Sequence, residues 1–228
     1  MERWFMCSEE EPVLTPAEGA LRLGVLVSGR GSNLEAILDA IKQGKLSARV
    51  AVVISNKKDA AALERAARYQ VPAIFLDQTH YSRREEYDAA VLQQLKEFGV
   101  EFVVLAGYMR LVTPTLIQPY HDRIINTHPS LLPAFPGMHA QRQALSYGVR
   151  VSGCTIHFVD EEMDHGPIIA QASVPVFEGD TVEQLSERIL AEEHRLLPQV
   201  LQLYAEGKLK VDGRKVHIRE GASTRSAR

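Results

Sequence analysis

Strand-like and helix-like segments alternate along the chain from residue 21 onward, and this alternation restricts the possible folds more than any other feature. Runs of β-branched and other apolar residues are followed by segments with apolar residues at helical spacing. The pattern is typical of a mostly parallel sheet with helices packed on both of its faces. It predicts strands at residues 21–27, 50–54, 73–76, 101–106, 123–127, 152–159 and 168–177, and helices at residues 34–41, 60–69, 83–98 and 181–204.

The length of the chain, 228 residues, favours one α/β domain over two smaller ones. We expect a Rossmann-like, doubly wound α/β fold in which the sheet is mostly parallel and the C-terminal region is a mixed sheet. A proline-rich segment at residues 129–137 cannot be a helix interior, and loops of this kind often carry function. The predicted domain spans residues 21–211, between an N-terminal tail at 1–20 and a C-terminal tail at 212–228.

Charge and cysteine content exclude several classes of function. The 26 Lys and Arg residues stand against 29 Asp and Glu, so the formal net charge is -3 and no global positive field would attract nucleic acid. Cys7 and Cys154 are far apart and form no CxxC pair, which indicates a reducing compartment and no zinc site. No apolar run approaches the ~20 residues of a bilayer span, and the first residues lack a signal-peptide pattern. We therefore expect a cytoplasmic protein with no metal, membrane or nucleic-acid partner.

A glycine-rich loop, SGRGSN at residues 28–33, joins the first predicted strand to the first predicted helix. Glycines let backbone N–H groups approach an anion at a helix N-terminus, so the loop is a candidate phosphate site. It departs from the dinucleotide fingerprint because Leu34 stands where a third glycine belongs, and it lacks the Gly-Lys-Ser/Thr ending of a nucleotide-triphosphate loop. The alternative is a plain glycine turn in which Ser32 caps the helix.

Asn126 and His128 flank Thr127 at the end of a predicted strand, so the two-residue period turns their side chains to the same side. An amide donor and an imidazole at the carboxyl end of a strand would suit an anion that develops during acyl transfer. A histidine in such a loop is also often a hydrogen-bonded structural residue. His139 and His157 are weaker candidates, and His157 could be a satisfied histidine of the sheet.

An acidic loop at residues 160–164 follows the sixth predicted strand. Such a run is usually a solvated charged surface. Asp164 differs from its neighbours, because the sequence His-Gly-Pro follows it and predicts a tight turn that would hold one carboxylate in place. No set of His, Cys, Asp and Glu residues has the spacing of a metal site. Asp164 is therefore the third candidate for chemistry.

Taken in order, these segments resemble the phosphoribosylglycinamide formyltransferases, the folate-dependent glycinamide ribonucleotide transformylases of purine synthesis. The resemblance covers roughly residues 21–211 and is carried by the motifs SGRGSN, LAGYMRL, NTHPSLLPAFPG, HFVDEEMDHGPI and AEEH. NTHPSLLP with the downstream aspartate is typical of the wider formyltransferase superfamily. SGRGSN and the short chain narrow the resemblance to the phosphoribosylglycinamide formyltransferases. The resemblance implies 10-formyltetrahydrofolate as the co-substrate and glycinamide ribonucleotide as the acceptor. A monomer and a homodimer both remain open.

The resemblance also implies roles for individual residues. Asn126, His128 and Asp164 would be catalytic. Glu193 would contact the glycinamide end of the acceptor. The acceptor's phosphate would be held by Gly31, Ser32 and Asn33, and the folate would be bound by Arg84, Met109, Arg110, Leu111, Val112 and Asn126.

In the implied mechanism, the amine of the acceptor attacks the formyl carbon on the folate nitrogen, and a tetrahedral centre with a negative oxygen forms. Asn126 would donate a neutral hydrogen bond to this oxygen, and protonated His128 would donate a charge-assisted one. A histidine in water, with a pKa of about 6.5, is mostly neutral at pH 7, so Asp164 would favour the charged form. Direct proton transfer and transfer through a water ordered by Asp164 both stay open.

Other members of the superfamily are the alternatives. A methionyl-tRNA formyltransferase would carry a further basic domain for tRNA, and the chain ends soon after residue 211. A 10-formyltetrahydrofolate hydrolase would carry an N-terminal regulatory domain, for which the ~20 residues before the first predicted strand are too few. A protein that only binds folate would not need the three candidate catalytic residues together.

Overall fold

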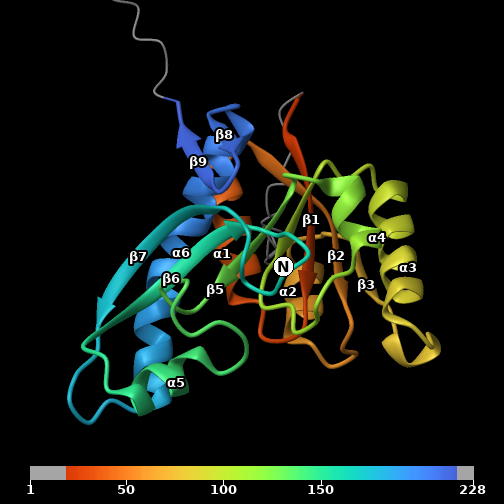
Figure 1. Ribbon diagram of the computed structural model, residues 1–228. Coiled ribbons are helices and arrows are strands. Elements are labelled where there is room, and N and C mark those ends of the chain that lie inside the picture. Colours follow the sequence, from red (N-terminus) through yellow and green to blue (C-terminus); the bar gives the residue numbers. More distant parts are fainter. Residues whose placement is uncertain (1–18, 220–228) are drawn as a thin grey trace, which may run out of the picture.

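The computed structural model describes residues 19–219, so Cys7 and most of both predicted tails lie outside the described residues. Within this range the chain forms one nine-stranded sheet in the order β3-β2-β1-β4-β5-β6-β7-β9-β8 (Figure 1). The strands from β3 to β5 pair in parallel, whereas β6 pairs antiparallel with both β5 and β7. This confirms the predicted α/β fold with a mostly parallel sheet and a mixed C-terminal region.

The observed elements follow the predicted periodicity closely. The strands are β1 (Leu21–Val27), β2 (Ala48–Ser55), β3 (Ala73–Phe75), β4 (Phe102–Leu105), β5 (Ile124–His128), β6 (Val151–Phe158), β7 (Ile168–Pro175), β8 (Leu209–Asp212) and β9 (Lys215–Ile218). The helices are α1 (Ser32–Lys42), α2 (Ala61–Arg68), α3 (Arg84–Glu97), α4 (Pro114–Ile117), α5 (Ala140–Tyr147) and α6 (Val182–Ala205), with short 3₁₀ turns η1 (Gln78–His80) and η2 (Gln118–Tyr120).

Two differences from the predicted elements lie near the C-terminus. β7 ends at Pro175 instead of residue 177, because the N–H of Phe177 turns to the side chain of Asp180. β8 and β9 form a hairpin that pairs with β7, although residues 212–218 were placed in the C-terminal tail. Both strands are short and half-exposed, so they lack the continuous apolar run by which the other strands are recognised.

Two hydrophobic clusters occupy the two faces of the sheet. One face is covered by α1, α2, α5 and α6, and the other is covered by α3 and α4. Alternation along β1 divides its side chains between them, with Val25 in the first cluster and Leu26 in the second. The ends of the parallel strands are therefore held rigidly from both sides.

Candidate functional site

The chain order reverses between β1 and β4, which are neighbours in the sheet. In doubly wound folds such a reversal opens a crevice at the carboxyl ends of the strands, where ligands bind. The loops that follow β1 and β4 are tied together there. The N–H of Ser28 donates to the carbonyl of Gly107 at 3.2 Å, and the N–H of Met109 donates to Ser28 Oγ at 2.8 Å.

The glycine-rich loop leads directly into α1. Gly31 is the N-cap residue, with a left-handed φ of 77°, and no side chain caps the helix. Ser32 is therefore the first helical residue, and the expectation that it caps the helix is wrong. Because no side-chain oxygen accepts from the first-turn N–H groups, these groups are available to an anion. Glycine is required for close packing, since a Cβ at Gly31 would lie 2.6 Å from the Cβ of Ala62.

Asn33 and Glu193 form a buried pair between α1 and α6. Asn33 Nδ2 donates a 2.8 Å hydrogen bond to Glu193 Oε2, and the two residues are only 7% and 4% exposed. Burial raises the pKa of Glu193 to about 7, although the hydrogen bond from Asn33 acts in the opposite direction. The side-chain amide of Asn33 is therefore engaged with Glu193, and the backbone N–H is the group of Asn33 that faces the start of α1.

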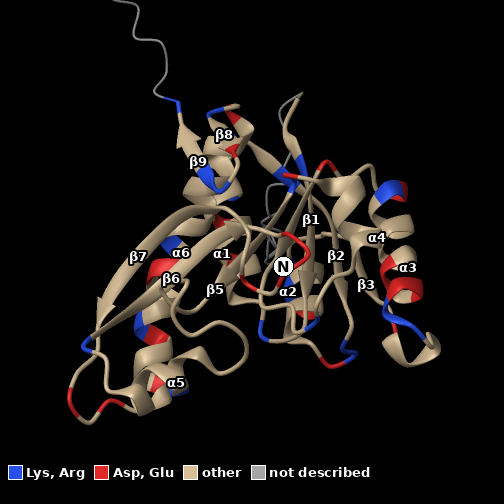
Figure 2. Ribbon diagram, in the orientation of Figure 1, with Lys and Arg blue, Asp and Glu red and all other residues tan. Residues whose placement is uncertain are grey.

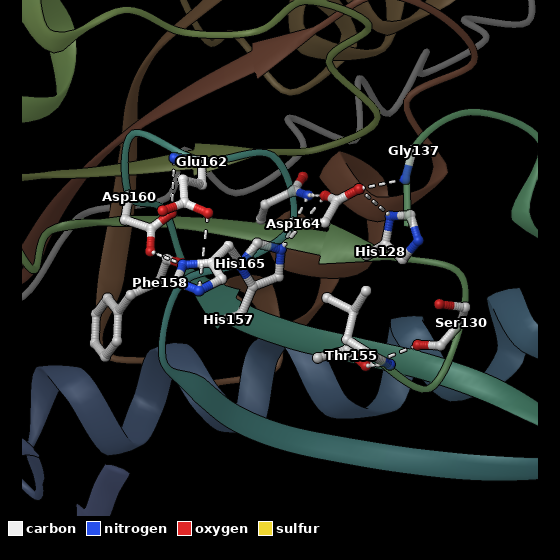
Figure 3. A network of polar contacts seen from close by, with 12 residues as sticks. His128, Ser130, Gly137, Thr155, His157, Phe158, Asp160, Glu162, Asp164 and His165 are labelled. Carbon is white, nitrogen blue, oxygen red and sulfur yellow. Dashed lines mark hydrogen bonds and ion pairs between the residues drawn. The ribbon is translucent and has the colours of Figure 1, made fainter. Parts of the chain in front are cut away.

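The carboxyl end of β5 places His128 beside Asp164, which belongs to the loop between β6 and β7 (Figure 3). Asn126, on the same strand, also contacts Asp164. Asp164 Oδ2 lies 3.3 Å from His128 Nδ1 and accepts a 2.7 Å hydrogen bond from the N–H of Gly137. Asp164 Oδ1 accepts a 3.4 Å hydrogen bond from Asn126 Nδ2. The side chains of His128 and Asp164 are largely shielded from water, at 5% and 11% exposed. The three residues predicted for chemistry are thus brought into one cluster.

His157 also belongs to this cluster, although the sequence marked it only as a weaker candidate. It lies opposite Asn126 in the antiparallel ladder between β5 and β6. His157 Nδ1 donates to the carbonyl of Phe158 at 2.8 Å, so Nε2 accepts from Asn126 Nδ2 at 3.3 Å (Figure 3). Burial lowers the pKa of His157, which keeps the ring neutral at pH 7. The other weaker candidate, His139, is exposed at the start of α5.

The loop after β4, the strand next to β5, presents exposed apolar side chains at the same end of the sheet as Asn126 and His128. Met109 and Leu111 are 68% and 49% exposed, whereas Val112 packs against the second hydrophobic cluster. Arg110 does not extend into solvent, because its guanidinium lies 4.3 Å from the centre of the Tyr87 ring and donates to Gln78 Oε1. The exposed apolar pair suits a flat aromatic ligand, and Arg110 serves to hold the loop.

A polar chain links the loops after β1 and β4, and sequence patterns gave no sign of it. Ser28 Oγ donates to Asn56 Oδ1 at 2.6 Å, and Asn56 Nδ2 donates to Gln78 Oε1 at 3.1 Å. Gln78 then accepts from Arg110. Arg84, at the start of α3, is exposed and makes no hydrogen bond or ion pair among residues 19–219. Arg84 is therefore a positively charged group that faces solvent, and it lies six positions after Gln78 in the sequence.

Basic and acidic residues are interspersed along α3 and α6 (Figure 2). Across the described part of the chain, no group of three or more His, Cys, Asp or Glu side chains is placed to hold a metal ion. None of the helices that the structure describes is long and apolar enough to cross a membrane.

Comparison with known proteins gives consistent matches. The formyl transferase family model matches residues 21–201. Phosphoribosylglycinamide formyltransferase of Escherichia coli is 42% identical over 191 residues, which is 84% of this chain and 90% of that protein. The crystal structure of glycinamide ribonucleotide transformylase 1 from Symbiobacterium toebii superposes with a TM-score of 0.88 at 54% identity, covering 90% of this chain and 96% of the other.

Longer proteins also match over the same region. The human trifunctional purine biosynthetic protein adenosine-3 is 45% identical over 190 residues, and this chain spans only 19% of its length. The bacterial relatives, in contrast, are matched almost from end to end. With the family model covering most of the fold and these relatives above 40% identity, the chain belongs to the phosphoribosylglycinamide formyltransferases of the formyl transferase family.

Proposed function

We propose that this chain transfers the formyl group of 10-formyltetrahydrofolate to the amine of glycinamide ribonucleotide, with Asn126, His128 and Asp164 at the reacting atoms. The observation that carries the proposal is the shared carboxylate, because Asp164 contacts His128 through one oxygen and Asn126 through the other. Relatives that match this chain over most of its length are named for formyl transfer to this acceptor. Their names support the choice of substrates.

The hydrogen-bond partners of His128 support a charged imidazole. Its Nε2 lies 2.9 Å from the carbonyl oxygen of Phe135, which can only accept, so Nε2 carries a proton. Its Nδ1 faces Asp164 Oδ2, which is also an acceptor when the carboxyl group is ionised. With a proton on both nitrogens, Nε2–H donates to the carbonyl of Phe135 and Nδ1–H faces the carboxylate, so the pair is an imidazolium beside a carboxylate. A charged donor of this kind stabilises a developing oxyanion more than a neutral one does.

The reaction that fits these groups has two steps. The acceptor's amine nitrogen bonds to the formyl carbon, and the carbonyl electron pair moves to the oxygen. The charge on that oxygen would be met by the amide N–H of Asn126, whose present bonds of 3.3 and 3.4 Å are long and easily redirected, and by the Nδ1–H of His128, which lies 3.3 Å from Asp164 as an ion pair without a hydrogen bond. The carbonyl bond then re-forms, and the carbon–nitrogen bond to the folate breaks. Asp164 accepts the proton that the attacking amine loses, and this proton passes to the leaving nitrogen.

Binding of the two substrates is assigned to the two loops at the switch point. The backbone N–H groups of Gly31, Ser32 and Asn33, at the start of α1, would donate hydrogen bonds to the phosphate of the acceptor. Glu193 would face its glycinamide end. The pteridine would lie on the residues 109–112, and Arg84 would meet the negative tail of the folate. Because the net charge of the chain is -3, two anionic substrates must be held by such local groups.

A two-substrate assay tests the proposal. Purified protein is supplied with 10-formyltetrahydrofolate, with and without glycinamide ribonucleotide, and the formylated nucleotide, tetrahydrofolate and formate are quantified. We expect formylated nucleotide and tetrahydrofolate in equal amounts, and only when the acceptor is present. Release of formate at a rate indifferent to the acceptor would instead make the protein a hydrolase of the same superfamily, and no turnover would make it a binding protein.

A further inference from the structure

The hairpin of β8 and β9 contacts the loop that carries Asp164. Arg214 lies in the turn between the two strands and reaches His165, the residue after Asp164. Its Nη2 donates to the backbone carbonyl of His165 at 2.7 Å, and its Nη1 lies 2.7 Å from His165 Nε2. A residue from the far edge of the sheet thus holds both the backbone and the ring of His165.

His165 also contacts Asp160, at the start of the same loop. Its Nδ1 lies 2.8 Å from Asp160 Oδ2 (Figure 3), and the carboxylate accepts, so Nδ1 carries the proton. Its Nε2 keeps the lone pair that accepts from Arg214 Nη1. The other oxygen of Asp160 accepts from the N–H of Glu162 at 3.1 Å. These contacts therefore join Asp160 at the start of the loop to His165 at its end, and Arg214 joins that end to the β8–β9 hairpin.

The loop needs such support because little else holds it. Asp164 has a left-handed φ of 53°, a region that few residues other than glycine adopt, although Asp is among the types found there more often. Glu161, Glu162 and Met163 are exposed, so no packed core surrounds the first half of the loop. Apart from the contacts of Arg214, His165 and Asp160, Asp164 is held through its carboxylate. In the proposed reaction that carboxylate must remain beside His128.

We propose that Arg214 is a positioning residue for the formyl transfer, which fixes the Asp164 loop so that the carboxylate stays against His128. This rests on the proposed catalytic role of Asp164. The two-pronged contact requires a guanidinium, since the ammonium group of lysine is a single donor point that could replace one of the two hydrogen bonds. Arg214 is itself exposed, so its removal leaves no cavity and no buried unpaired charge.

The test is the kinetics of Arg214→Ala in the full-length chain. We expect kcat to fall about tenfold or more, because displacement of a catalytic group by about 1 Å can cost about 10²-fold. The KM values for the nucleotide and the folate should stay within about twofold, since Arg214 touches neither substrate loop. Arg214→Lys should recover part of the lost kcat. Lys210→Ala is the matched control, because Lys210 is exposed on the same hairpin and its side chain makes no hydrogen bond or ion pair in the described part of the chain.

A second comparison separates positioning from general loss of structure. In an Asp164→Asn background, Arg214→Ala should lower kcat no further, because the carboxylate it positions is already gone. The proposal is overturned if Arg214→Ala keeps the wild-type kcat, if both KM values change as much as kcat, or if the two losses multiply. The proposed function fails separately, if the wild-type protein does not formylate the nucleotide.

Discussion

His128 is the residue on which the proposed chemistry depends most, and Asp164 is its charged partner at Nδ1. Asp164→Asn removes the charge and keeps the size of the side chain. We expect Asp164→Asn and His128→Ala each to lower kcat about 10²- to 10³-fold, the range for losing an oxyanion donor. The dissociation constant of the nucleotide should change little, because neither residue belongs to the phosphate loop. Steady-state kinetics and calorimetric titration with the nucleotide measure the two effects.

Glu161→Gln is the matched control for this prediction. Glu161 lies in the same loop as Asp164, is exposed, and makes no hydrogen bond or ion pair within residues 19–219. It should keep the wild-type kcat. Equal losses in Glu161→Gln and Asp164→Asn would mean that loop charge in general, and not the carboxylate beside His128, sets the rate.

Glu193 makes the stability of the protein depend on pH. Burial raises its pKa to about 7 from an ordinary value of 4.5, so the folded state binds the proton more tightly than the unfolded chain does. The contribution of this group to stability is fully present below pH 4.5 and is lost as the pH rises through about 7. The loss amounts to roughly 3 kcal/mol in the free energy of unfolding above that pH.

Glu193→Gln isolates this effect, because glutamine stays neutral and its amide oxygen can still accept from Asn33. Urea unfolding of the variant and the wild type, at about pH 5 and about pH 8.5, should show the variant gaining stability over the wild type mainly at the higher pH. Glu187→Gln changes an exposed residue on the same helix. Its difference in stability from the wild type should be the same at both pH values. A stability difference that does not depend on pH would show that Glu193 is not buried in its protonated form.

Sequence patterns predict some of these residue contacts and not others. The two-residue period of a strand is enough to place Asn126 and His128 on one side. The contact between Asn33 and Glu193 is beyond such reasoning, because the residues are 160 positions apart and meet only where α1 packs against α6. His157 reaches Asn126 through the register of the β5–β6 ladder, which no local pattern fixes.

At the level of elements, the N-terminus of α1 is fitted closely against α2. A Cβ at Gly31 would lie 2.6 Å from Ala62 Cβ and 2.7 Å from its Cα, at a φ of 77°. We expect Gly31→Ala to lower the free energy of unfolding by about 3 kcal/mol, through strain and overpacking together. Displacing the helix start should also raise the KM for the nucleotide severalfold and leave the KM for the folate unchanged. Urea unfolding and two-substrate kinetics test both parts.

The control for Gly31→Ala lies at the other end of the same helix. Gly44 has a φ of 68°, and a Cβ there would meet nothing within 4 Å. Gly44→Ala should therefore cost only the backbone term, about 1–2 kcal/mol, and leave both KM values unchanged. If the two variants lose equal stability, close approach to α2 is not what requires glycine at position 31.

Elements differ in how readily the sequence predicts them. β1, β2 and β4 are buried between two helical layers, so each is a run of apolar residues that stands out in the sequence. The hairpin of β8 and β9 joins the sheet mainly through β7 and remains half-exposed. Its one local signal is Asp212-Gly213, a pair that favours tight hairpin turns, and this signal is weak without flanking strands of clear alternation.

For the molecule as a whole, the central sheet separates two hydrophobic clusters that share a backbone but face opposite sides. Val91 of α3 belongs to one cluster, and Val200 of α6 belongs to the other. Both side chains are almost completely buried, at 0% and 1% exposed. Because the backbone of the sheet lies between the two clusters, packing defects on the two faces should act independently.

We expect Val91→Ala and Val200→Ala each to lower the free energy of unfolding by about 2 kcal/mol, from lost burial and an unfilled cavity. The double variant should lose the sum to within about 0.5 kcal/mol, as distant sites do. Val200→Ala combined with Leu197→Ala is the contrast, because these residues lie three apart on one helix face and in one cluster, so their losses should not add. Urea unfolding of the wild type, the three single variants (Leu197→Ala included) and the two double variants measures both couplings. A coupling above about 1 kcal/mol between Val91 and Val200 would mean that the sheet transmits packing changes from face to face, and the edge that carries the site would then respond to both.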